Sequence, residues 1–257
     1  MTALKRFACG PTIIVLCLTV ASLACAQVGS INSAAYQTRQ YNDIPGATLT
    51  AVTNYNSAIV FDEHNVSAPT GFANRDVWRF SNNGGASAYA FGNNDYFQVS
   101  MTLQLTGSPT SPRKEAGFVL STIGGDGQFI VNTDGHEIVA FGGPLPFYSF
   151  APSVYNSSDI ITLGMTYFLD GNTGLRSIIY TANGVNSPIL AFTDLEQGII
   201  DNSTLGGYFQ IVNDPSNPNN FGAAVFQNIH ITAVPEPSSL ILLSVGLLPL
   251  LLRRRSI

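Results

Sequence analysis

The chain has 257 residues, of which 45% are hydrophobic and only 11% are charged, whereas an ordinary soluble domain carries roughly 25% charged residues. Its 11 Lys and Arg residues are too few for a nucleic-acid-binding surface, and its 16 Phe and 10 Tyr residues are too many for a disordered chain. The low charge also excludes a coiled coil.

The formal net charge of −5 combines three unlike regions. Residues 1–26 carry two basic residues and no acid, and residues 234–257 carry three arginines and one acid, Glu236. The body, residues 27–233, is left with 6 basic and 15 acidic residues, a net charge of −9. Because an acidic body repels phosphate backbones and anionic membranes, we expect its partners to be neutral molecules or cations.

The N-terminus is typical of a secretory signal peptide. A basic start is followed by an apolar segment, residues 12–23, that is too short to span a bilayer with ease. The small residues Ala24 and Ala26 predict cleavage by signal peptidase before Gln27. We therefore expect a signal helix that is absent from the exported protein.

All three cysteines of the chain, Cys9, Cys17 and Cys25, lie in this removable segment. The mature protein is thus expected to have no disulfide, and thiol catalysis and cysteine zinc sites are excluded. An alternative makes Cys25 the acylated first residue of a lipoprotein. Ser22 disfavours it, because such sites usually have a Leu-like residue at that position.

The C-terminus, residues 234–257, holds the most specific pattern of the chain. A proline-rich tripeptide precedes an apolar segment, residues 238–252, which predicts a hydrophobic helix of about 15 residues. A basic cluster follows and would stay cytoplasmic. Such a short span suits a transient membrane anchor. The residues of the pattern are Pro235, Glu236 and Pro237, then Arg253, Arg254 and Arg255.

This order of tripeptide, apolar segment and arginines closely resembles the PEP-CTERM sorting signal of Gram-negative bacteria. The resemblance implies export, an inner-membrane intermediate, and processing of the tail by an exosortase-type transpeptidase. It further implies a final place at the cell surface or in the extracellular polysaccharide matrix. The resemblance covers only about 24 residues and implies nothing about the body. A plain C-terminal membrane anchor is the alternative.

The body has the periodicity of β-strands. Apolar and polar residues alternate at every position of residues 97–105, which predicts a half-buried strand, and residues 161–167 repeat the pattern. Turn sequences such as Asn183-Gly184 separate the predicted strands. Further strands are predicted at residues 58–61, 77–80, 87–91, 116–121, 128–132, 137–141, 175–181, 189–192, 208–212 and 225–231.

About twelve short strands predict an all-β antiparallel sandwich formed by one domain over residues 27–233. A capping sequence at residues 193–196 predicts one short helix. The size and strand pattern are similar to the concanavalin A-like lectin and glucanase jelly roll, without a diagnostic motif. Two tandem immunoglobulin-like modules of about 100 residues each are the alternative.

The body lacks the common sequence patterns of catalytic sites. The paired-carboxylate signature of retaining jelly-roll glucanases, the Gly-x-Ser-x-Gly motif and the Walker phosphate loop do not occur in it. His64, His136 and His230 share no metal-ligand spacing. The sequence therefore predicts a protein that is not an enzyme, with a glycoside hydrolase lacking the usual signature as an alternative.

Two loops carry oxygen-bearing side chains of the kind that bind calcium. Asp170 and Asn172 lie in one loop, and Asp214 lies in the other, an Asn- and Pro-rich stretch at residues 213–220. Ordinary turn formation is the simpler interpretation of both loops. No cofactor is predicted, with calcium as the only candidate.

A loop at residues 141–150 concentrates four aromatic residues. Phe147 and Tyr148 could stack on sugar rings while Asn132 supplies hydrogen bonds, or the rings could simply pin the loop to the core. The leading hypothesis is an exported, non-catalytic surface or matrix protein that binds extracellular polysaccharide through a lectin-like sandwich. A purely structural matrix protein or adhesin is the alternative.

Overall fold

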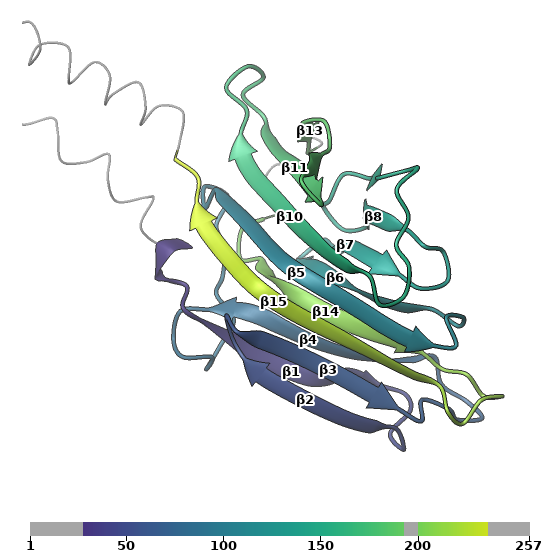
Figure 1. Ribbon diagram of the computed structural model, residues 1–257. Helices are drawn as coiled ribbons and strands as arrows, with labels where there is room; N and C mark the ends of the chain where they lie inside the picture. Colours follow the sequence, from purple (N-terminus) through teal and green to yellow (C-terminus); the bar gives the residue numbers. More distant parts are fainter. Residues whose placement is uncertain (1–27, 193–199, 236–257) are drawn as a thin grey trace, which may run out of the picture.

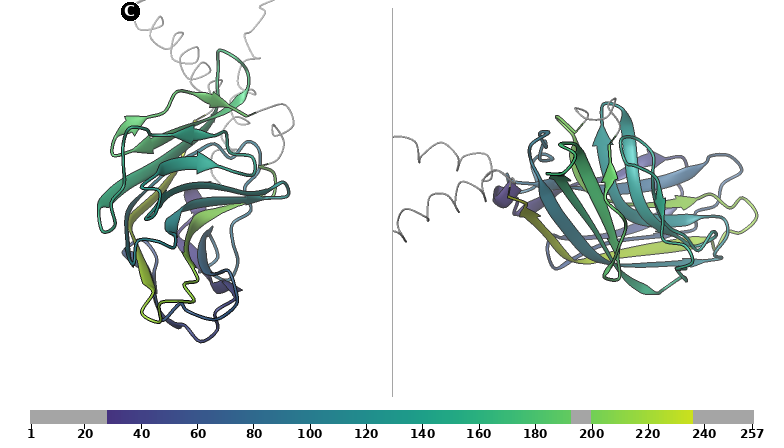
Figure 2. Two further views of the ribbon diagram at one scale, coloured as in Figure 1. Left: turned by 90° about the vertical axis from the view of Figure 1, so that its right-hand side faces the viewer. Right: turned by 90° about the horizontal axis from the view of Figure 1, so that it is seen from above.

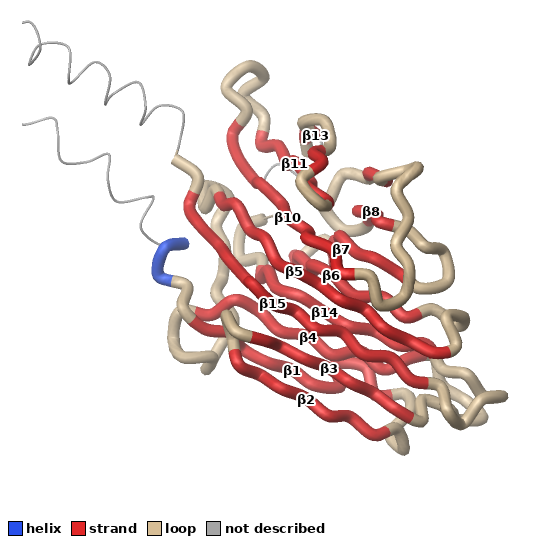
Figure 3. Tube along the Cα trace, in the orientation of Figure 1, coloured by secondary structure: helices blue, strands red, loops and turns tan. Residues whose placement is uncertain are grey.

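The computed structural model describes residues 28–192 and 200–235, which form two antiparallel β-sheets packed face to face (Figures 1 and 2). Strands account for most of this part of the chain, and its only helix is the 3-10 turn η2 (Val28–Ser30) (Figure 3). The predicted all-β antiparallel sandwich is thereby confirmed. The predicted signal helix, short helix at residues 193–196 and C-terminal helix lie outside the described residues. Within the described ranges no helix is long and apolar enough to cross a membrane.

The seven-stranded sheet has the strand order β1-β4-β14-β6-β7-β8-β9, so strands from both ends of the body meet in its centre. Its strands are β1 (Ser33–Asn42), β4 (Ala73–Ser81), β6 (Lys114–Thr122), β7 (Gly125–Asn132), β8 (Ile138–Phe141), β9 (Tyr148–Ser149) and β14 (Thr204–Val212).

The eight-stranded sheet has the order β12-β11-β10-β5-β15-β3-β2, and β13 pairs with β11 beside this path. Its strands are β2 (Thr48–Asn54), β3 (Ala58–His64), β5 (Phe97–Ser108), β10 (Ile160–Leu169), β11 (Arg176–Ala182), β12 (Val185–Asn186), β13 (Leu190–Ala191) and β15 (Phe221–Ala233). The long curved strands β5, β10 and β15 run side by side across this sheet (Figure 1).

The hydrophobic core lies between the two sheets and is rich in aromatic rings. Trp78 of the seven-stranded sheet is fully buried and packs edge-on against Phe80 at 5.2 Å and against Phe226 of the opposite sheet at 6.0 Å, between ring centroids. Burial of such large rings is the main stabilising term for a body without disulfides.

The strands differ from the sequence prediction in two places. The strand predicted at residues 87–91 is absent, since only Phe91 forms an isolated bridge, with Ser203. Strands β1 and β2 were not predicted, because most of their residues are half-buried or exposed and show no clear alternation. Their hydrogen bonds to β4 and β3 decide their conformation.

The central strands of the seven-stranded sheet are buried on both faces. All nine residues of β4 are buried, and β6 and β14 are nearly as enclosed. One face of each strand packs against the eight-stranded sheet. The other, which we call the outer face, carries polar and charged side chains that are nevertheless withdrawn from water.

Candidate functional site

The register of the seven-stranded sheet aligns a row of polar side chains across four strands of the outer face. Arg75 of β4 is opposite Gln210 of β14, which is opposite Glu115 of β6, which is opposite Asn132 of β7. All four residues are buried. Buried polar groups are costly unless they are paired, so we take this row as the candidate site of the outer face.

The next row along the strands is mostly apolar. Val77, Tyr208, Ile130 and Val139 pack together with Val119 as a small hydrophobic cluster separate from the main core. This cluster lies beside the polar row and excludes water from it. Low local dielectric strengthens the polar contacts there.

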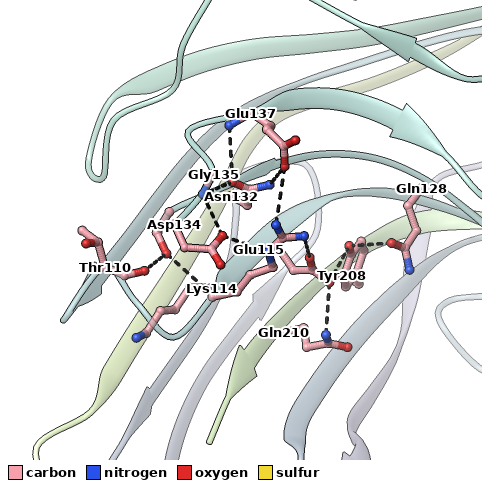
Figure 4. Close-up of polar contacts among 12 residues, drawn as sticks. Thr110, Lys114, Glu115, Gln128, Asn132, Asp134, Gly135, Glu137, Tyr208 and Gln210 are labelled. Carbon is pink, nitrogen blue, oxygen red and sulfur yellow. Dashed lines mark hydrogen bonds and ion pairs between the residues drawn. The ribbon is translucent and has the colours of Figure 1, made fainter. Parts of the chain in front are cut away.

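A hydrogen-bond network joins Tyr208 to its neighbours on the outer face (Figure 4). The Tyr208 hydroxyl lies 3.2 Å from Oε1 of Glu115 and 3.1 Å from Oε1 of Gln128. It has one hydrogen to donate, so it serves one of these two acceptors at a time. Gln210 donates from Nε2 to the same Glu115 oxygen at 3.1 Å.

Arg75 covers this network. Its guanidinium carbon lies 4.5 Å from the centre of the Tyr208 ring, and its Nη2 forms an ion pair of 2.9 Å with Asp126 of β7. A cation over an aromatic face is attracted to the ring. Tyr208 is consequently fully buried and Glu115 is buried as well, whereas Gln128 is half-buried and is the most exposed member of the network.

The protonation of the network follows from its burial. Desolvation raises the pKa of Glu115, although the nearby Arg113 charge opposes this shift. Burial also raises the pKa of Tyr208 well above its ordinary value, and the Glu115 charge adds to this effect. Tyr208 therefore keeps its proton, while Glu115 can exchange one closer to neutral pH than an ordinary glutamate.

Arg113 holds Glu115 from the other side. The Arg113 side chain lies between three carboxylates: its Nε is 2.9 Å from Asp134, and its Nη atoms are 3.5 Å from Glu137 and 3.7 Å from Glu115. Asn132 donates to the same Glu137 at 2.6 Å (Figure 4). This arrangement orients Glu115 within the polar row.

Arg79, further along β4, is a buried cation whose direct partners are all neutral. It is 9% exposed and donates to Thr204 Oγ1 at 3.2 Å, Ser121 Oγ at 2.8 Å and the Trp78 carbonyl at 3.3 Å. Burial lowers the pKa of Arg79 to about 10, the Asp126 charge opposes this, and the Arg75 charge adds to it. A buried cation without a carboxylate in direct contact is ready to bind an anion.

The residues predicted to bind glycan are not brought together. Asn132 lies on the outer face but is fully buried in hydrogen bonds to Glu137 and Gly135. Phe147 is 71% exposed, whereas Tyr148 packs edge-on against Phe150 at 4.9 Å. Sugar contact by Phe147 and Tyr148 stays a prediction.

The calcium candidates are occupied by turn contacts. Asp170 accepts hydrogen bonds from the Asn172 amide at 3.0 Å and from the Thr173 hydroxyl at 2.8 Å, and these bonds lower its pKa. Asp214 likewise accepts from Ser216. In the part of the chain that the structure describes, no three His, Cys, Asp or Glu residues form a group that could hold a metal ion.

None of the three histidines bonds to Glu115 or Tyr208. His64 ends β3 and His230 is exposed on β15, both in the eight-stranded sheet. His136 lies in the β7–β8 turn with Nδ1 2.9 Å from the Tyr155 carbonyl. Glu115, whose pKa is raised by burial, is therefore the candidate proton-exchanging group of the outer face.

Sequence reasoning missed every charged residue of this site. Sequence motifs are defined within short segments, whereas Arg75, Arg79, Glu115 and Tyr208 come from three strands that are distant in the chain. A usable signal was present: Arg75 and Arg79 are the third and seventh residues of a strand otherwise fit for a core. Charges at such positions are rarely buried without a partner or a function.

Comparison with protein families confirms the sorting signal. Residues 233–255 match the PEP-CTERM protein-sorting motif. This motif implies export, membrane-associated sorting and processing by an exosortase-type system. Among curated proteins, none matches the chain in sequence.

Comparison with solved structures identifies the class of the fold. The body is similar to alginate lyase A1-II′, a member of polysaccharide lyase family 7, with TM-score 0.51, 13% identity, and 80% of this chain and 98% of that chain covered. A variant of that lyase in complex with substrate gives TM-score 0.51 and 12% identity, covering 82% and 97%. An alginate lyase from Pseudomonas aeruginosa gives TM-score 0.50 and 12% identity, covering 80% and 89%. At such identities the likeness shows the fold, a jelly-roll sandwich shared with polysaccharide lyases.

These neighbours correct the functional prediction. The sequence predicted a protein that is not an enzyme, because it carries no known catalytic motif. These three structures with the same sandwich are all lyases and align over most of both chains. The prediction of a non-catalytic matrix protein is contradicted by this finding.

Proposed function

We propose that this protein is an exported polysaccharide-processing enzyme that cleaves an acidic polysaccharide of the alginate type at the outer face of the seven-stranded sheet. The observation that carries the proposal is Arg79, a buried cation with only neutral partners, on the same face as the Glu115–Tyr208 network. Similarity of the sandwich to alginate lyases supports the reaction type.

A lyase reaction on a uronic acid needs an anion-binding group and a proton-exchanging group. Binding of the sugar carboxylate by a cation acidifies the neighbouring C–H bond. A base then removes that proton, the C–O bond to the next sugar breaks, and a carbon–carbon double bond forms. The leaving oxygen takes up a proton, and no water is consumed.

Glu115 and two cations match these roles along a bound chain. Arg79 lies four positions along the strands from the row of Glu115, so it would bind the carboxylate of a neighbouring sugar, without first breaking an ion pair, because its partners are a carbonyl and two hydroxyls. Arg113, 3.7 Å from Glu115, is the cation that would face the carboxylate of the sugar that Glu115 deprotonates. Glu115 would accept the proton, since its raised pKa makes it a stronger base than an ordinary carboxylate. Tyr208 is a positioning residue, because its ring is fully buried beneath Arg75 and its hydroxyl is held between Glu115 and Gln128.

The test is an assay of the purified protein with alginate and with a neutral glucan. We expect the protein to produce the ultraviolet absorbance of unsaturated sugar ends from alginate but not from the neutral glucan. Glu115→Gln keeps acceptors for Tyr208 and Gln210, so the fold should be retained while the rate falls by about 10²–10⁴-fold, the usual contribution of general acid–base catalysis. Asp170→Asn, in a distant turn, is the control.

Two outcomes would contradict the proposal. Reducing ends without unsaturated ends would identify a hydrolase. An unchanged rate in Glu115→Gln would remove Glu115 from the chemistry.

Phe147 is the best remaining candidate for sugar contact outside the outer face, because its ring is largely exposed. We expect Phe147→Ala to raise KM with little change in kcat, as loss of a stacking contact would do. An equal fall in kcat and kcat/KM would instead place the ring near the reacting sugar.

The sorting signal supports a site of action outside the cytoplasm. We propose that signal peptidase removes residues 1–26, and that the processed protein resides at the cell surface or in the polysaccharide matrix of a Gram-negative bacterium. The Pro235→Ala, Pro237→Ala double variant should keep its tail in the native host. Unchanged processing of the double variant would contradict this assignment.

A further inference from the structure

The sorting motif begins directly at the last strand of the sandwich. Strand β15 ends at Ala233, and the Val234 amide continues its pairing by donating to the Tyr96 carbonyl at 2.9 Å. Pro235, the first residue of the Pro-Glu-Pro motif, follows without a linker. The folded body therefore determines where the motif starts.

At this point the outer surface of the eight-stranded sheet contains an apolar groove of about 270 Å³, roughly the volume of nine water molecules. Its walls are formed by Tyr96, Thr166, Phe168, Leu169 and Ile179, and by Val234 and Pro235 themselves.

The groove is built to receive an apolar segment. Thr166 and Ile179 are register partners on β10 and β11, and Phe168 lies two residues beyond Thr166 on the same face. These side chains are half-buried rather than covered. Proline-rich segments bind aromatic-lined grooves well, because their extended conformation is already rigid and loses little entropy.

We propose that this groove binds the Pro-Glu-Pro segment of the chain itself, with Pro237 seated between Phe168 and Ile179. The described chain ends at Pro235 inside the groove wall, so Glu236 and Pro237 start there and reach the groove at no cost in loop closure. Folding of the body thereby holds the sorting motif against the sheet. The sorting enzyme must draw the motif out of the groove before it can act.

The inference is independent of the polysaccharide reaction and is tested with a single thiol. The natural cysteines all lie in residues 1–26, so replacing Cys9, Cys17 and Cys25 by Ser and introducing Ser238→Cys gives one reporter next to the motif. The full chain is held in detergent micelles, and the rate of reaction with a water-soluble maleimide is measured.

Two groove variants give the expected result. Phe168→Ala removes one wall, and Thr166→Trp fills the groove without removing apolar surface. Each should raise the labelling rate roughly tenfold, which corresponds to about 1.4 kcal/mol of lost docking free energy. Val185→Ala, at an exposed position of the same sheet outside the groove, is the matched control and should leave the rate unchanged.

A pulse-chase experiment in the native host gives a second reading, in which both groove variants should lose the tail faster than the Val185→Ala control. The proposal is overturned if the thiol of the chain with an intact groove reacts as fast as it does in denaturant. It is also overturned if both groove variants fold and label at the unchanged rate.

Discussion

Tyr208 acts on Glu115 through a single hydroxyl. Burial raises the pKa of Glu115, and the hydrogen bond from this hydroxyl offsets part of that rise. The ring itself is held by the Arg75 guanidinium. The hydroxyl and the ring can therefore be separated by substitution.

We expect Tyr208→Phe to keep the ring beneath Arg75 and to raise the pKa of Glu115 further, because the charged carboxylate loses a donor. If Glu115 is the base, the rising limb of kcat/KM against pH moves to higher pH. A pH profile with the limb unchanged and only the amplitude reduced would contradict this role for Tyr208.

A second group of buried charges lies between the sheets near β3 and β4. Arg39 forms an ion pair with Glu63 at 2.7 Å, and its backbone amide donates to Asp76 at 2.7 Å. Both acids are fully buried, so one cation serves two carboxylates. Burial raises the pKa of Glu63 to about 7, and the charge of Asp76 contributes to this shift.

This raised pKa makes stability depend on pH in a defined direction. The folded protein binds a proton at Glu63 that the unfolded chain releases between its ordinary pKa of 4.5 and about 7. The stabilisation is complete below the lower value. This stabilisation is lost as the pH rises to the folded-state pKa of about 7. Between the two pKa values the free energy of unfolding falls by about 1.4 kcal/mol for each pH unit.

We expect Glu63→Gln to remove most of this decline, since Gln cannot titrate and still accepts from Asn74. Urea unfolding of the wild type and the variant at pH 4.5 and at about pH 7 measures this fall in the free energy of unfolding. A variant that retains the full pH dependence of the wild type would show that another group is responsible.

Among the elements, the central strands of the seven-stranded sheet approach one another closely at glycine. A Cβ atom on Gly206 of β14 would collide with the Trp78 carbonyl of β4, and one on Gly117 of β6 would collide with the Phe129 carbonyl of β7. The obstructing atoms are backbone, so they cannot rotate away. These glycines permit the strand spacing that assembles the outer face.

Gly206→Ala is therefore expected to lower the free energy of unfolding by about 1–3 kcal/mol, the usual cost of overpacking. Gly171→Ala, in a turn with no atom near the added methyl group, should change it by less than about 0.5 kcal/mol. Thermal unfolding compares the two. Equal stability of the variants would show that the sheet can widen at β14 without cost.

For the molecule as a whole, both described ends of the chain lie at the same end of the sandwich. The turn η2 at the N-terminal end contacts β15, close to where Pro235 ends the described C-terminal part (Figure 1). A membrane-bound intermediate would then hold this end of the sandwich toward the membrane.

The mature body is expected to depend on its core alone for stability, because it contains no cysteine after residue 26. Its thermal unfolding midpoint should be the same with and without a reductant. A lower midpoint in reductant would indicate that the N-terminal segment is retained and that its cysteines are paired.

The sequence by itself determined what depends on neighbouring residues in the chain. Strict alternation predicted β5 and β10, the dipeptide Asn183-Gly184 predicted the turn between β11 and β12, and the order of the C-terminal residues identified the sorting motif. Each of these features is specified within a segment of about two dozen residues or fewer. The exposed strands β1 and β2 lacked such a pattern and could not be predicted.

Only the tertiary structure decided the candidate site. Arg75, Glu115, Gln128 and Tyr208 become neighbours because β4, β6, β7 and β14 pair in one register, although β14 follows β7 by about 70 residues. A shift of one residue in any pairing would turn that strand's side chains to the opposite face. Register between distant strands is set by packing of the whole sandwich, so the candidate site could not be predicted from local motifs.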